Sequence, residues 1–136
     1  MSFNWSDLLV LATELGNRGT NEADLRSSIN RAYFASHCIA RKYLRDDEND
    51  INLNYKVYFK ELRVGYHTYV INTFLESNDS NKQDIGRDLE RLFDNRKKAD
   101  YKDLIHPNIS FIQNMAQISI NMANNINDNI NDLKSI

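Results

Sequence analysis

The stretch LRSSINRAYFASHCIARKY, residues 25–43, decides the fold of this chain. It contains no Pro or Gly, and its apolar and small residues recur every three or four positions, which is the spacing of an α-helix. One side of this helix carries Leu25, Ile29, Ala32, Ser36, Ile39, Ala40 and Tyr43. The opposite side is not purely polar, since it carries Arg31, Phe34, Ala35 and Cys38. A helix with apolar groups on two sides is buried on two sides, so the stretch predicts the central helix of a bundle or a helix that also faces a partner subunit.

Four further helices are predicted around this one. Apolar residues at helical spacing indicate helices over about 4–16, 57–77 and 80–99, and a last helix that begins near Ser110. The apolar side of the last helix carries Ile112, Met115, Ile118, Met122, Ile126, Ile130 and Leu133. The connections are short, which favours antiparallel neighbours. The sequence therefore predicts an all-α protein, an antiparallel bundle of four to five helices, with residues 1–136 in a single domain.

Two capping residues mark helix starts. Asn21 is placed to cap the central helix, because Asn at this position accepts a hydrogen bond from a free backbone N–H. Ser80 is followed three residues later by Gln83, which is the pattern of a capping box at the start of the fourth helix. The acidic stretch 46–54 is expected to be a loop.

The composition excludes several classes of protein. The chain has 136 residues, of which 41% are apolar and 26% are charged, and this mix is typical of a globular domain rather than a disordered one. Cys38 is the single cysteine, and no Cys/His cluster has zinc spacing, so neither a disulfide nor a metal or other cofactor is predicted. The start MSFNWSDLL is not basic and precedes no long apolar run, so we expect no signal peptide, no membrane span and a cytoplasmic location.

The charge is unevenly placed. The net charge is −2, which argues against a general polyanion binder. Yet the stretch 25–45 holds no acidic residue and five basic ones, namely Arg26, Arg31, Arg41, Lys42 and Arg45. This locally basic helix is either an anion-binding face or a solvated helix surface.

Four segments, in a fixed order, resemble motifs of one protein family. Residues 26–35 read RSSINRAYFA, residues 67–71 read HTYVI, and residues 92–101 read LFDNRKKADY. The chain opens with Trp5, Leu8, Leu11 and Ala12. These segments are similar to the RSAISRAYYA, H..VI, L..LR..R..ADY and W..YL.LA patterns of the HEPN proteins, a helical family of prokaryotic RNA-cleaving toxins and their inactive relatives.

The resemblance covers the chain up to about Asp103 and implies both a fold and a site. It implies a bundle of four or five helices, frequently homodimeric, whose polar groups face a cleft at or near the dimer interface. The active ribonucleases of the family carry an Arg followed, after four to six residues, by a His. The His acts as general acid or base near neutral pH, and the Arg holds the phosphate and stabilises the charge that develops on it. No metal is needed for this chemistry.

This chain matches the Arg but not the His of that motif. Arg96 stands where the Arg belongs, and Tyr101 stands at the position of the His. A phenol with an ordinary pKa of about 10 is a poor proton acceptor at pH 7. His106 lies ten residues after Arg96, outside the spacing. The ADY ending is characteristic of the branch of the family that lacks the catalytic His.

The candidate site residues follow from this comparison. The candidates for catalysis are Arg96, Tyr101 and His67, the last because the family pattern carries a His there. The candidates for binding a nucleic acid or a nucleotide are Arg31, Arg96, Asp100 and Lys97. Arg31 and His37 also satisfy the motif spacing, but they lie six positions apart in one helix, so their side chains diverge by about 120°.

Each candidate also has a structural interpretation. Arg31 is expected to pair with Asp100 and so to tie the second helix to the fourth. Arg96 and Asp100 are four residues apart and are alternatively placed to pair with each other. Tyr33 and Tyr101 are expected to be core residues whose hydroxyls find partners. Lys97 is then a solvated surface cation.

Three functions remain open on these grounds. The first is a HEPN-type, metal-independent endoribonuclease of a toxin–antitoxin or antiviral defence system. The second is a non-catalytic helical protein that binds a nucleotide, an RNA or a partner protein through the same cleft, and the missing His favours it. The third is a dimerisation or scaffold element. The resemblance implies a homodimer or a complex with a partner such as a minimal nucleotidyltransferase.

Overall fold

Helices make up most of the residues that the computed structural model describes, which are 3–18, 21–53 and 65–135. Within these ranges there are five α-helices, one short 3-10 turn and no strand. The helices are α1 (Ser6–Arg18), α2 (Glu22–Asp46), α3 (Tyr66–Leu75), α4 (Ser80–Tyr101) and α5 (Ile109–Lys134), and the turn is η1 (Ile51–Leu53). The prediction of an all-α protein built as a helical bundle is confirmed.

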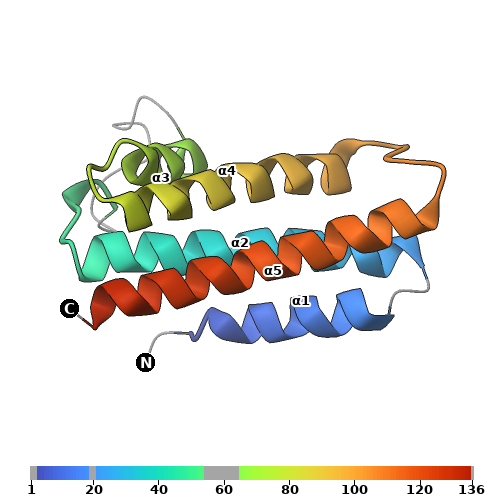
Figure 1. Cartoon of the computed structure of the whole chain (residues 1–136), viewed down its shortest axis with the longest axis horizontal. Helices are drawn as coiled ribbons and strands as arrows, with labels where there is room; N and C mark the ends of the chain where they lie inside the picture. Colours follow the sequence, from blue (N-terminus) through green and yellow to red (C-terminus); the bar gives the residue numbers. More distant parts are fainter. Residues whose placement is uncertain (1–2, 19–20, 54–64, 136) are drawn as a thin grey trace.

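The helix α2 is the centre of the bundle. It packs against α1, α4 and α5, and α1 lies on the far side of α2 and α5 from α4 (Figure 1). The helices α1 and α2 run in opposite directions, as do α4 and α5, and the short α3 packs beside the first half of α4 (Figure 1). On the second side of α2, for which the sequence predicts burial, Ala35 and Cys38 are buried. Arg31 and Phe34, on the same side, are exposed.

The core forms because each helix buries one apolar stripe. The largest cluster joins α2, α3, α4 and α5, and its fully buried side chains include Tyr33, Phe74, Leu89 and Ile126. A second cluster, around Leu25, closes the end of the bundle where α4 leads into α5. Burial of apolar surface at about 25 cal/mol per Å² is the main force that holds the helices together.

One sequence prediction on the helices needs correction, and another falls partly outside the described residues. Within the described residues the third helix begins at Tyr66, and its predicted start near Val57 lies outside them. Ile118 departs from the predicted apolar side of α5, since its side chain is 55% exposed while that of Ile120 is only 3% exposed. The side of α5 that meets the bundle also includes the small residues Ala116, Ser119 and Ala123, which let the neighbouring helices approach closely.

The predicted cap of α2 is confirmed, and the predicted cap of α4 is wrong. The Asn21 side chain accepts a hydrogen bond from the Asp24 backbone N–H at 2.8 Å. At α4 the capping residue is Asp79, whose carboxylate accepts from the N–H groups of Asn81 and Lys82. Ser80 is already the first helical residue, so no Ser80–Gln83 capping box forms.

Substitution of Asp79 by Ala is expected to destabilise the protein by about 1 kcal/mol, because two N–H groups of the first turn then lose their acceptor. Ser80→Ala is the matched control and is expected to change stability by less than about 0.5 kcal/mol. Urea unfolding followed by circular dichroism measures both. A larger loss in Ser80→Ala than in Asp79→Ala would contradict the assignment of the cap.

None of the helices in the described ranges is long and apolar enough to span a membrane.

Candidate functional site

The helices α2, α3 and α4 meet at a pair of histidines. His67 lies in the first turn of α3, and its Nδ1 is 2.7 Å from the hydroxyl of Tyr33 on α2. The ring of His37, one turn further along α2, lies with its centroid 4.3 Å from that of His67. Phe93 of α4 stacks on the other side of His67, with 5.6 Å between the centroids. We call His37 and His67 the histidine pair.

Both histidines are neutral at pH 7. His37 is 2% exposed, and burial, the nearby His67 and Arg41 together lower its pKa to about 3. Burial also lowers the pKa of the half-buried His67, and the charges of Arg96 and Arg41 lower it further. Within the described residues, Nδ1 of His37 has no hydrogen-bond partner.

We assign the tautomer of His67 from its contact with the Tyr33 hydroxyl. Burial raises the pKa of Tyr33, so the phenol keeps its proton. A phenol is a good donor, and donation to Nδ1 of His67 satisfies both buried groups. The neutral imidazole then carries its own proton on Nε2 and acts there as a hydrogen-bond donor. His67 is therefore arranged to donate to a ligand rather than to accept a proton from it.

The charges of two arginines act on the histidine pair. Arg96 on α4 donates from Nε to the Asp100 carboxylate at 2.8 Å, and both side chains are about a quarter exposed, at 25% and 23%. Of the two pairings considered for Asp100, the Arg96–Asp100 pair within α4 therefore forms. Arg41 on α2 lowers the pKa of both histidines, and no carboxylate in the described part of the chain lies within ion-pair distance of it.

The predicted pair between Arg31 and Asp100 does not form. The Asn30 amide donates to both oxygens of Asp100, at 3.0 and 3.2 Å, and Arg31 donates to the Asn30 side-chain oxygen at 2.8 Å. Successive residues of a helix point about 100° apart, so Asn30 faces α4 and Arg31 turns to solvent. Arg31 and Asp100 still line one surface hollow between α2 and α4, together with Arg26 and Ser27. Arg96 is linked to this hollow through Asp100.

Tyr101 and Lys97 are exposed residues of α4 that do not contact the histidine pair. Tyr101 is 72% exposed, so its prediction as a core residue is wrong, because α4 extends past its packing partners at this last residue. Its ring lies 5.8 Å from the Arg96 guanidinium carbon. Lys97 pairs with Asp94 at 3.2 Å and lies over the ring of Phe93, with its Nζ 4.7 Å from the centroid.

The motifs did not point to His37, and they did not connect it with Arg41, which the sequence places only on a locally basic helix. Arg31 and His37 point in different directions, as the helix geometry predicts, since Arg31 is exposed and His37 is buried. However, Tyr33, His37 and Arg41 follow one another at intervals of four residues, which places them on one face of α2. This spacing was the signal that could have found them.

The chemistry open to this cluster is anion binding. The charges of Arg96 and Arg41 act on His67, and guanidinium groups suit the oxygens of a phosphate. Within the ranges 3–18, 21–53 and 65–135, no group of three or more His, Cys, Asp or Glu residues is placed to hold a metal ion.

Comparison with known proteins adds no relative. No family model matches the chain, and the searches of curated proteins and of solved structures found no significant match.

Proposed function

We propose that this chain is a HEPN-like helical protein that binds the phosphate of an RNA or a nucleotide beside Arg96 and His67, and that it does not cleave RNA. The setting that fits this proposal is a prokaryotic toxin–antitoxin or antiviral defence system, with the chain as a homodimer or in complex with a partner protein. Support comes from the family-like segments 26–35, 67–71 and 92–101, which are far apart in the sequence and lie on the three helices that meet at the histidine pair.

The observation that carries the proposal is the hydrogen bond between Tyr33 and His67 beside two arginines. It leaves the Nε2 proton of His67 as a donor. The positive charges of Arg96 and Arg41, which act on His67, favour the binding of an anion. The Arg96–Asp100 pair holds Arg96 in place, much as a supporting carboxylate orients a binding residue. A phosphate would then receive hydrogen bonds from more than one helix.

The same geometry argues against ribonuclease activity. A general base needs an unprotonated nitrogen or oxygen within reach of the 2′-hydroxyl. In the assigned tautomer, Nδ1 of His67 accepts from Tyr33 and Nε2 holds the ring proton. His37 is almost fully buried, so its free Nδ1 is out of reach of an RNA strand. No histidine of the cluster is therefore set up to activate the nucleophile.

The binding test uses a fluorescently labelled single-stranded RNA and measures its anisotropy at low salt. We expect saturable binding by the wild-type protein and about a tenfold loss of affinity in Arg96→Ala and in Arg41→Ala, because a hydrogen bond from a charged group contributes about 1.5–3 kcal/mol. Arg87→Ala is the matched control, since Arg87 is also on α4 and also pairs with an acidic neighbour, Asp84. Its affinity should stay unchanged. Equal losses in all three variants, or no saturable binding, would contradict the proposal.

A cleavage assay separates binding from catalysis. The same RNA is incubated with the protein in EDTA, and we expect it to remain intact. RNA cleavage that persists in EDTA and disappears in Arg96→Ala would instead establish the metal-independent ribonuclease.

A further inference from the structure

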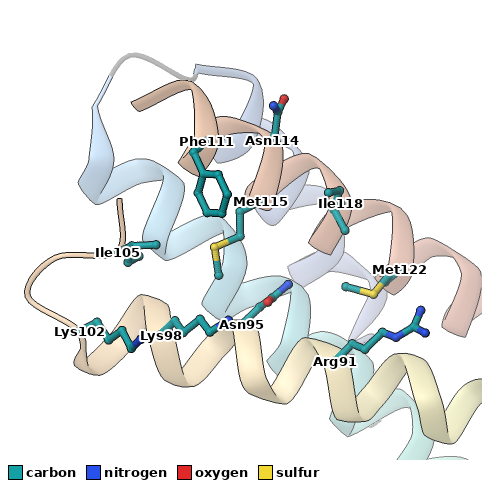
Figure 2. Close-up of a pocket in the computed structure, with 10 residues that line it drawn as sticks. All are labelled: Arg91, Asn95, Lys98, Lys102, Ile105, Phe111, Asn114, Met115, Ile118 and Met122. Carbon is teal, nitrogen blue, oxygen red and sulfur yellow. The ribbon is translucent and has the colours of Figure 1, made fainter. Parts of the chain in front are cut away.

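A groove runs between α4 and α5 on a different face of α4 from the histidine pair. Figure 2 shows side chains from both helices pointing into it, and the groove has a volume of about 610 Å³. From α4 it is lined by Arg91, Asn95 and Lys98, followed by Lys102 at the C-cap of this helix, and from α5 by Phe111, Asn114, Met115, Ile118 and Met122. Ile105, in the connection between the two helices, closes one end.

The groove is bordered by two regular rows of side chains. The basic ridge consists of Arg91, Asn95, Lys98 and Lys102, and the apolar ridge consists of Phe111, Met115, Ile118 and Met122. In both ridges the residues are separated by four, three and four positions. Within α4 and α5 this is the heptad spacing by which one helix presents a continuous seam to another. Lys102, at the C-cap, continues the basic ridge past the end of α4. The two ridges lie side by side and form the two walls of the groove. Their spacing suits the binding of a third helix between them.

The apolar ridge is left partly uncovered within the monomer. Phe111 is 50% exposed and Ile118 is 55% exposed, while Met115 and Met122 form the floor at 8% and 9%. Exposed apolar side chains in a row, with polar groups at the rim, are typical of an interaction surface. Methionines suit such a surface because their flexible, polarisable side chains adapt to the partner.

The basic ridge sets the charge of the occupant. None of the residues that line the groove is acidic. Among the described residues, no carboxylate lies within ion-pair distance of Arg91, Lys98 or Lys102, although both neighbouring cations of α4, Arg96 and Lys97, have such partners. Arg91 also acts on its neighbour Asp88, so Lys98 and Lys102 are the cations that favour an occupant with acidic residues on the side that faces α4.

We propose that this groove binds an amphipathic, acidic α-helix of a partner protein, with its apolar side on the apolar ridge and its acidic side against the basic ridge. The apolar ridge extends over eleven residue steps of α5, which corresponds to about 16 Å or three helical turns. Apolar anchors at heptad spacing in a groove are the usual mode of helix recognition. An RNA strand is disfavoured because its phosphates gain nothing from the Met and Ile side chains of the floor.

The test uses a fluorescein-labelled synthetic peptide of about 14 residues, with Leu at heptad positions and Glu beside them. The control peptide has Lys in place of every Glu. We expect the acidic peptide to bind the wild-type protein saturably and the basic peptide to bind at least tenfold more weakly. Fluorescence anisotropy measures both affinities.

Two pairs of variants locate the binding. Lys98→Glu should weaken the acidic peptide at least tenfold, whereas Lys97→Glu, with the same charge change on the residue before, should leave its affinity within about twofold. Ile118→Glu should also abolish binding, whereas Val10→Glu, at a 58% exposed position on α1, should not. Circular dichroism confirms that each variant is folded, and Lys98→Glu remains decisive if Ile118→Glu does not fold.

Three results would overturn the proposal. They are the absence of saturable binding by the acidic peptide, equal binding of the two peptides, and equal losses in Lys97→Glu and Lys98→Glu. An RNA oligonucleotide that shifts the NMR signal of the Ile118 methyl group, where the acidic peptide does not, would assign the groove to nucleic acid. Because Arg96 and His67 do not line the groove, loss of RNA binding at the histidine pair leaves this test unaffected.

Discussion

Lowering the pH from 8 to 4 is expected to destabilise the protein by about 3 kcal/mol through His37 alone. In the folded state the pKa of His37 is about 3, and in the unfolded chain it returns to its ordinary value near 6.5. Between these two values the unfolded chain binds a proton that the folded protein does not. The free energy of unfolding therefore falls as the pH drops through this range, by up to about 1.4 kcal/mol per pH unit.

The variant His37→Gln isolates this contribution. The amide does not titrate, so the free energy of unfolding of the variant should depend less on pH between 7 and 4 than that of the wild type. Other groups titrate in both proteins, among them Asp46, whose pKa is lowered by Arg45, and Asp88, whose pKa is raised by burial, and they cancel in the difference. Urea unfolding at several pH values gives both curves. Parallel curves would show that His37 is not held neutral by its surroundings.

Replacement of Phe74 by Ala is expected to cost about 3–5 kcal/mol, the largest effect of any substitution considered for this protein. Phe74 is fully buried on α3, in the core cluster shared with α2 and α4, and its ring centroid lies 6.4 Å from that of Tyr43. Removal of the ring leaves a cavity that the surrounding helices cannot fill completely. Because α3 also carries His67, the variant should loosen the histidine pair as well as the core.

Phe111→Ala is the matched control for Phe74→Ala. It removes the same ring from a side chain that is 50% exposed, so the expected cost is below about 1 kcal/mol. Both variants are compared by urea unfolding at pH 7, and the Tyr33–His67 contact is followed by NMR. Similar losses in the two variants would contradict the description of the core.

The helices could be predicted from the sequence because each one depends on local patterns, namely apolar residues at helical spacing and capping residues at the helix starts. Residues 25–43 carry the period of a buried helix, and α2 is indeed the central element. The cap of α4 was misplaced by one residue because Asp79 and Ser80 are both good capping residues. The choice depends on the preceding turn, in which Ser77 accepts from the Asp79 N–H and its carbonyl accepts from Gln83.

The site could be predicted only in part, because it depends on how three helices are rotated against one another. His67 and Arg96 were identified from motifs, but the contact of His67 with His37 joins residues that are thirty positions apart. A rotation of about 100° separates Asn30, which reaches Asp100, from Arg31, which does not. No local pattern in one sequence fixes that rotation.

The most direct test of the proposed phosphate site is NMR of the protein with ¹⁵N-labelled histidine, at pH 7, with and without a short single-stranded RNA. We predict that neutral His67 carries its proton on Nε2, and that RNA shifts its ring signals in the wild type but not in Arg96→Ala. Ring signals of His67 that stay unchanged at saturating RNA, or a proton on Nδ1, would contradict a site in which His67 and Arg96 together donate to a phosphate.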